Sequence, residues 1–187
     1  MTMADPQRFT LFSRLLHWMM AILILAMLFI GVGMVASLSS YHWLISIHEP
    51  LGVLILILAA IRLVNRLLNP APPLPVEMPG WQRLAAHASH IVLYVLMLAL
   101  PLVGWAMLSA ARYPIVLFGA WRLPPILPHD SAVYAVLRTT HTALALLLFA
   151  TFLAHLGAAL THALIYRDGV FPSMASWKIR ADAGRAE

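Results

Sequence analysis

The chain contains no cysteine among its 187 residues. This absence excludes disulfides, iron–sulfur clusters and zinc sites with cysteine ligands, and haem attached covalently through a C-x-x-C-H motif. Charged side chains are also scarce, at 10% of the residues, whereas a typical soluble domain has about 25%. Because 62% of the residues are hydrophobic and the mean hydropathy is +0.86, the composition is that of a membrane protein and not of a water-soluble globule.

Four segments are apolar enough to cross a membrane, since a span needs about 20 mostly apolar residues. They cover residues 15–38, 43–68, 84–111 and 136–166. The second span carries Glu49, Arg62 and Arg66, which we expect near its two ends, where long side chains reach water. The predicted fold is an all-α membrane protein, a bundle of four transmembrane helices. We expect one domain over residues 1–187, with a short polar tail at 174–187.

Lysine and arginine are distributed unevenly between the two sides that four spans define. The side with both termini and the middle connection carries Arg8, Arg14, Arg62, Arg66, Arg83, Arg167, Lys178, Arg180 and Arg185. The opposite side carries only Arg112, Arg122 and Arg138. The positive-inside rule therefore predicts that both termini are cytoplasmic. The net charge of +5 indicates topology rather than a phosphate-binding patch, so we expect no nucleic-acid partner.

Histidine is the polar residue that stands out, with nine copies, because an imidazole in hydrocarbon is costly unless it is paired or liganded. In the fourth span His155 follows His141 by 14 residues, which corresponds to about 21 Å along a helix and about 40° around it. The two side chains therefore share one face at opposite depths. Each has a partner at its own level, so we predict the pairs His48 with His141 on the outer side and His17 with His155 on the inner side.

Two histidine pairs at two depths favour two haems, each held by two histidines in the core of the bundle. Without cysteine, non-covalent b-type haem is the natural form. Zinc is an alternative on the inner side alone, where several histidines gather. For any one of the four histidines taken singly, an interhelical hydrogen bond or a proton or metal path in a small transporter also remains open.

Three further histidines compete as ligands on the inner side. His87 and His90 lie on one helix face, three residues apart. His162 is disfavoured as a ligand because it lies 21 residues from His141, about 31 Å along the helix and the full thickness of the hydrocarbon. Cations lie at the right levels to pair with haem propionates; they are Arg62, Arg66, Arg83 and Arg138.

Several short motifs follow one another on these spans: LLHW at 15–18, IHEPLG at 47–52, HASH at 87–90 with LY at 93–94, LRTTH at 137–141, AH at 154–155, and His162 with RDG at 167–169. This ordered set resembles the bacterial cytochrome b561 family over about residues 9–175. The resemblance implies a four-helix protein of the bacterial inner membrane that holds two haem b groups and exchanges electrons with the quinone pool. Its haem ligands fall on His17, His48, His141 and His155, the pairing already inferred from depth.

The family that this sequence resembles includes superoxide oxidase. The resemblance therefore implies transfer of electrons from superoxide, through both haems, to ubiquinone near His87, His90, Tyr94 or His162. The alternative is a cytochrome b anchor that links a dehydrogenase or a periplasmic redox protein to quinone. Its docking surface would be the Pro-rich outer loop 112–131 with Phe118 and Trp121.

The chain departs from its relatives at two positions. The residue after the second-span histidine is often small or basic in relatives and is Glu49 here, which lowers the positive potential beside the outer haem. Relatives also tend to have two adjacent histidines near the end of the fourth span, whereas Ala163 follows His162 here. Both departures concern the sites of the electron donor and the quinone rather than the number of haems.

Overall fold

The computed structural model describes residues 8–117 and 119–175. Four long helices dominate it: α1 (Leu11–Ala36), α2 (Tyr41–Leu68), α3 (Gly80–Ala110) and α4 (Ser131–Thr161). A π-helical turn, η1 (His162–Tyr166), continues α4, and a short helix α5 (Val170–Ala175) follows. The outer loop contains two short antiparallel strands, β1 (Val116–Leu117) and β2 (Trp121–Arg122). Four helices are long and apolar enough to cross a membrane, which confirms the predicted fold class.

The helices begin two to five residues before the predicted spans, and at α1 and α4 polar caps extend the helix beyond its apolar stretch. The Thr10 side chain accepts a hydrogen bond from the Ser13 backbone N–H at the start of α1. The Asp130 carboxylate accepts from the backbone N–H groups of Ala132 and Val133 at the start of α4. Such caps satisfy the free N–H groups of the first turn, a signal that hydropathy does not register. Of the predicted tail, residues 176–187 lie outside the described part of the chain.

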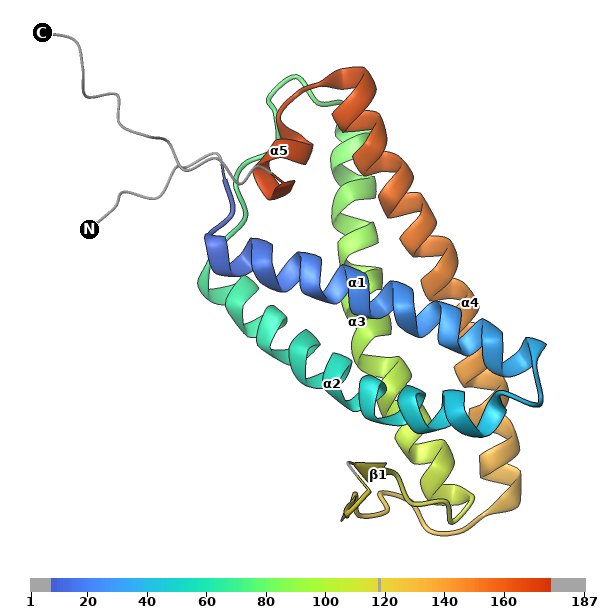
Figure 1. The fold of residues 1–187 in the computed structure, drawn as a ribbon. Coiled ribbons are helices and arrows are strands. Elements are labelled where there is room, and N and C mark those ends of the chain that lie inside the picture. Colours follow the sequence, from blue (N-terminus) through green and yellow to red (C-terminus); the bar gives the residue numbers. More distant parts are fainter. Residues whose placement is uncertain (1–7, 118, 176–187) are drawn as a thin grey trace, which may run out of the picture.

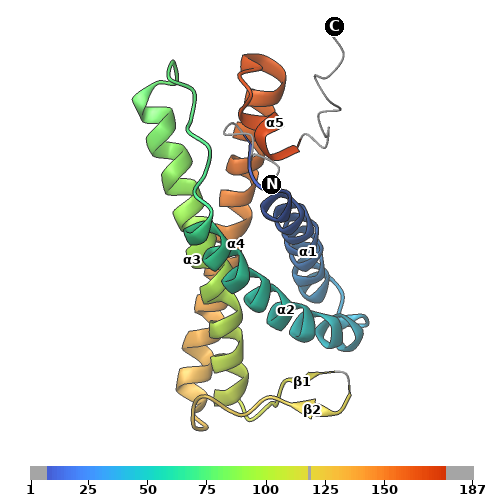
Figure 2. The same ribbon diagram turned by 90° about the vertical axis from the view of Figure 1, so that its left-hand side faces the viewer.

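The long helices form two antiparallel hairpins that cross each other. α1 packs along α2 and α3 packs along α4, while the contact between α2 and α3 joins the two hairpins. Figures 1 and 2 show the first hairpin lying obliquely across the second. The α4 helix buries Leu148 alone among its residues, so it faces the first hairpin through partly buried side chains.

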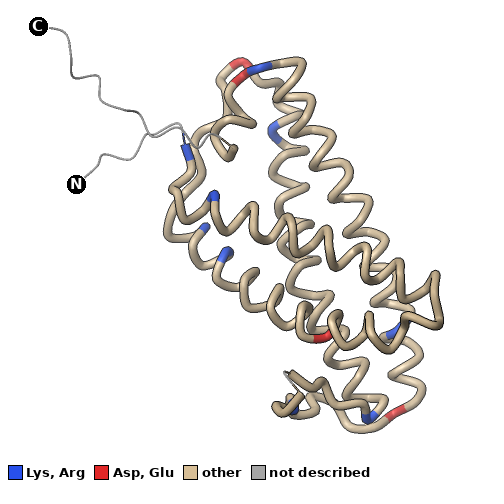
Figure 3. Tube along the Cα trace, viewed as in Figure 1, with Lys and Arg blue, Asp and Glu red and all other residues tan. Residues whose placement is uncertain are grey.

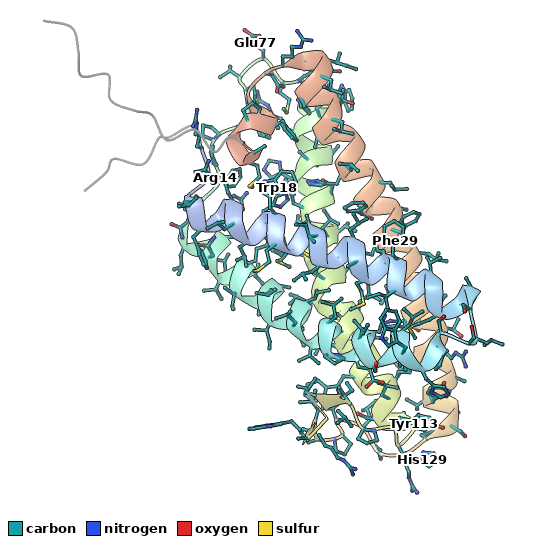
Figure 4. All side chains as sticks on the ribbon, in the orientation of Figure 1. Arg14, Trp18, Phe29, Glu77, Tyr113 and His129 are labelled. Atoms are coloured by element: carbon teal, nitrogen blue, oxygen red, sulfur yellow. The ribbon has the colours of Figure 1, made fainter. Side chains whose placement is uncertain are left out.

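The core lies where the hairpins cross and is entirely apolar. Its buried members come from all four helices: Leu16, Met20, Ile24, Ile55, Ala59, Leu96, Met97, Leu100 and Leu148. Large apolar side chains also cover the outside, such as Phe29 on α1, which is 71% exposed (Figure 4). In a water-soluble protein such a surface would aggregate, whereas hydrocarbon solvates it.

Charged residues lie toward the ends of the helices (Figure 3). We call the end where α1 begins and α4 finishes the inner end, and the opposite end the outer end. At the inner end α5 folds back onto the start of α1 (Figure 1). There the Phe9 N–H donates to the Ser173 carbonyl, and the Trp18 indole Nε1–H donates to the Met174 carbonyl. Residues near the two ends of the described chain therefore lie at the same end of the molecule.

Candidate functional site

The outer site brings His48 of α2 to His141 of α4. Their ring centroids lie 6.2 Å apart, with the ring planes inclined by 64°. The Nδ1 atoms of both rings are buried, and no hydrogen-bond partner for them is found among the described residues. A buried polar atom without a partner costs free energy, and neither ring recovers that cost through its Nδ1 atom.

The inner site brings His17 of α1 to His155 of α4. Their ring centroids are 6.3 Å apart and their planes are inclined by 69°. Arg62 of α2 donates a hydrogen bond from Nη2 to Nδ1 of His17 over 3.0 Å, and the ring of Trp18 stands edge-on to His17 at 5.5 Å. Trp18 lies between α1 and α5 (Figure 4), so α5 covers this site from the inner end.

Both separations fit a metal held in line between two imidazoles. A metal–imidazole bond is about 2.0–2.1 Å long and the ring centre lies roughly 1.1 Å beyond the nitrogen, which gives about 6.3 Å between centroids. The rings of His90 and His155 are closer, at 5.4 Å. A metal in line between those two would push them apart by roughly 0.9 Å. The inner geometry therefore favours His17 over His90 as the partner of His155, and the four histidines fit two haem groups.

Gly104 of α3 makes room for the outer pair. A Cβ atom at this position would lie 3.3 Å from Cε1 and 3.6 Å from Nδ1 of His141. The imidazole thus rests directly on the α3 backbone, where any side chain would displace it. From the sequence, Gly104 is one of several glycines within spans, and close helix packing is the commoner reason for such glycines. The structure shows a contact with His141 instead.

The remaining inner-end candidates lie in different surroundings. His87 is exposed, and its Nδ1 bonds to the Arg83 carbonyl within its own helix at 2.7 Å. His162 pairs with Asp168 at 2.6 Å, beyond His155. The Arg62 guanidinium lies 6.0 Å from the Tyr94 ring centroid, beside His17.

Two other inner arginines differ in their contacts. Arg66 stands over the ring of Phe9 at 5.4 Å, and its Nη1 is buried without a hydrogen bond to any described residue. Arg83 donates to the carbonyls of Pro75 and Val76 and so holds the linker rather than the histidines.

At the outer end Arg138 lines a shallow groove of about 360 Å³ with Thr139 and Thr142 on α4. His129 donates from Nδ1 to the Ala110 carbonyl over 2.8 Å, and His42 stands edge-on to Tyr41. Tyr113 and His129 mark this end in Figure 4. Neither His42, in the first turn of α2, nor His129 joins the paired histidines.

Residues 8–117 and 119–175 contain no site for the zinc ion that the sequence left as an alternative. No group of three or more histidine, aspartate or glutamate side chains there is arranged to hold a metal ion. Sequence reasoning missed two contacts at the inner end, the His162–Asp168 pair and the Trp18–Met174 hydrogen bond. The RDG motif after His162 is the signal that points to the first; nothing local points to the second.

The structure thus combines four membrane-length helices with two pairs of histidines in their interior. The chain belongs to the prokaryotic cytochrome b561 family, whose model matches residues 8–177. It is 32% identical over 174 residues to "Cytochrome b561 homolog 2" of Escherichia coli (strain K12), covering 90% of this chain and 92% of the relative. It is 30% identical over 176 residues to "Cytochrome b561 homolog 1" of the same organism, covering 89% and 96%.

A third relative, "Probable superoxide oxidase CybB" of Yersinia pestis, is 32% identical over 165 residues, covering 85% of this chain and 90% of the relative. Family membership makes this chain a multi-pass membrane protein of a family that transfers electrons, binds haem b and works with quinone. These findings confirm the family that the sequence motifs indicate.

Proposed function

We propose that this protein carries electrons from superoxide at its outer end to ubiquinone at its inner end, through two haem b groups. His48 and His141 hold the outer haem, and His17 and His155 hold the inner one. The observation that carries the proposal is the pair of ring separations, 6.2 and 6.3 Å, at two depths of one structure. The apolar surroundings and the absence of cysteine from the chain agree with b-type haem.

A bound b haem supplies a carrier for one electron at a time. The chain's own contribution is to hold both carriers on one face of α4 and to keep the layer between them dry. Leu148 lies midway between His141 and His155 in sequence and is 7% exposed. It packs in the apolar core with Leu96 and Leu100 of α3. Electron transfer from one haem to the other needs no acid–base or nucleophilic residue, and we assign no catalytic residue to that step.

Superoxide as the electron donor agrees with the charge of the outer end and with the number of electrons that quinone reduction needs. Each superoxide anion gives up one electron and leaves as O₂, so two anions supply the two electrons that reduce ubiquinone to ubiquinol, and two protons complete the product. Arg112, Arg122 and Arg138 lie at the outer end, opposed by Glu49 and Asp130. This small excess of positive charge favours approach of an anion.

The arrangement of basic residues supports a cytoplasmic position for the inner end. Arg14, Arg62, Arg66, Arg83 and Arg167 all lie toward it. By the positive-inside rule this distribution favours both termini in the cytoplasm, and membership of a prokaryotic membrane-protein family supports the bacterial inner membrane. The lipid bilayer and quinone are its partners.

The first experiment is a reduced-minus-oxidised spectrum of the purified protein, with a pyridine haemochrome assay for haem per chain. We expect a b-type spectrum and about two haems per chain. A colourless protein after expression with added haem would overturn the proposal and favour a proton or metal path through the histidines. A single haem would show that one of the two pairs is structural.

A second candidate function is an anchor subunit that passes electrons between quinone and a separate redox protein. The observation that favours it is the exposed aromatic surface of the outer loop, where Trp121 is 76% and Tyr113 is 65% exposed. Stopped-flow mixing of the isolated protein with superoxide separates the two functions. Fast second-order haem reduction supports the oxidase, whereas reduction that requires an added protein partner supports the anchor.

A further inference from the structure

At the inner end His162 and Asp168 form a close histidine–carboxylate pair, and neither residue belongs to the two histidine pairs. Nδ1 of His162, in the π-helical turn η1, lies 2.6 Å from Oδ2 of Asp168. The two side chains are 14% and 23% exposed, so they reach water without being fully surrounded by it.

The backbone conformation of the turn brings His162 and Asp168 together. Arg167 adopts a left-handed conformation, with φ of 52°, and its N–H closes the turn on the His162 carbonyl over 2.8 Å. The chain thereby reverses and brings Asp168 back to His162. The second carboxylate oxygen, Oδ1, accepts the backbone N–H of Val170 at the start of α5. With both oxygens engaged, the carboxylate has a fixed orientation.

His162 lies on the same face of α4 as the inner haem ligand. It follows His155 by seven residues, which corresponds to about 10.5 Å along the helix and about 20° around it. Beyond the pair, α5 continues to Met174, whose carbonyl is bonded to Trp18 beside His17. The pair thus stands between water at the inner end and the inner haem site.

Few other charged or titratable groups face this pair. The Tyr166 ring lies 5.2 Å from His162, and its hydroxyl accepts a hydrogen bond from Gln82 of α3. Arg167 donates from Nε to the Leu164 carbonyl. The α5 segment that packs against η1 contains no ionisable side chain. Asp168 is therefore the carboxylate that orients His162 within the described structure.

We propose that His162 and Asp168 form the proton-delivery dyad for quinone reduction at the inner end. This inference rests on the proposed function, because quinone takes up two protons with its two electrons. Asp168 accepts Nδ1–H and so directs Nε2 away from itself. The doubly protonated ring gives its Nε2 proton to a quinone oxygen. The ring, now neutral, keeps the proton on Nδ1 and its hydrogen bond to Asp168. Its Nε2 atom then takes the next proton from water.

Asp168→Asn is the sharpest variant because it separates the two contacts of the carboxylate. The remaining amide oxygen still caps Val170, since asparagine caps helices as well as aspartate does. The amide NH₂ in place of Oδ2 cannot accept Nδ1–H, so the ring loses its orienting partner. Asp130→Asn at the outer end is the matched control, with the same chemical change in a residue that also caps a helix.

The experiment pre-reduces the haems without oxygen, mixes the protein with ubiquinone-1, and follows haem reoxidation in H₂O and D₂O. We expect D168N and H162Q to slow reoxidation about 10-fold or more and to enlarge the solvent isotope effect. The double variant is expected to be no slower than either single one, and D168E to recover most of the rate. D130N is expected to match the wild type, and haem content and spectra to remain unchanged.

Equal reoxidation rates in the wild type, D168N and H162Q would overturn the dyad while leaving the proposed function intact. A D168E variant as slow as D168N, or a variant with an altered haem spectrum, would show that Asp168 is structural and would also overturn it. A wild type whose haems are not reoxidised by ubiquinone-1 would overturn the proposed function, and this inference with it.

Discussion

Arg62 of α2 donates a hydrogen bond from Nη2 to Nδ1 of His17 on α1 over 3.0 Å. Because arginine only donates, the Nδ1 atom accepts and the imidazole carries its proton on Nε2. A neutral histidine that binds haem iron through Nε2 must carry its proton on Nδ1 instead. If the proposed inner haem is held by Nε2 of His17, Nδ1 would carry the proton and could no longer accept from Arg62, which would remain a neighbouring cation.

The first prediction concerns that cation. Arg62→Gln removes a positive charge that favours the reduced haem, so the midpoint potential of one haem falls by some tens of millivolts while the other stays unchanged. A redox titration monitored by visible absorbance measures both potentials. Arg122→Gln, on the exposed outer hairpin, is the control. Equal shifts of both haems would contradict a local effect at His17.

The second prediction distinguishes the histidine pairs. His17→Ala or His155→Ala reduces the haem content from about two to about one per chain, because the inner haem would lose one of the two histidines that hold it. His48→Ala and His141→Ala do the same at the outer site, and the two groups of variants retain spectrally different haems. His90→Ala keeps both haems. If haem is lost with H90A and kept with H17A, the inner assignment is wrong.

The third prediction follows from the contact between Gly104 and His141. Gly104→Ala places a methyl group 3.3 Å from Cε1 of the imidazole, so the ring must shift by a few tenths of an ångström and outer haem occupancy falls. Gly104→Leu abolishes the outer haem and keeps the inner one. Gly31→Ala on α1 is the matched control, because no atom lies within 4 Å of its added Cβ. Measuring the haem content of the purified variants tests this prediction. Full occupancy of the outer haem site in G104L would contradict it.

The fourth prediction tests the acidic residue beside the outer site. Glu49 follows His48, and its carboxyl group hydrogen-bonds to the backbone of Val116 in β1. Glu49→Gln removes a charge that opposes both electron arrival and the approach of an anion. The outer midpoint potential rises by some tens of millivolts, and the superoxide reaction accelerates at low ionic strength. Glu77→Gln, in the inner linker, is expected to change neither quantity.

The fifth prediction tests orientation and takes advantage of the absence of cysteine from the native chain. A single cysteine introduced as Arg122→Cys at the outer hairpin reacts with a membrane-impermeant maleimide in intact cells. One introduced as Glu77→Cys in the linker reacts only after permeabilisation. Labelling in the opposite order would place the termini outside the cytoplasm and reverse the proposed direction of transfer.

Much of the fold was predictable because hydrocarbon imposes length and composition on each span. Helix starts were predicted two to five residues late, and at α1 and α4 the reason is that the caps Thr10 and Asp130 are polar. The single-domain assignment and the cytoplasmic position of the termini remain predictions. The part of the tail at residues 176–187 lies outside the described structure.

The sequence by itself determined the membrane class, the four helices and the face that His141 and His155 share, because periodicity within one helix is a local property. Only the tertiary structure decided that His17 rather than His90 stands at a ligand distance from His155. It also decided that His141 rests on Gly104 and that Asp168 turns back to His162. These relationships depend on how two hairpins cross and where one left-handed residue reverses the chain, and spacing along a helix does not encode either.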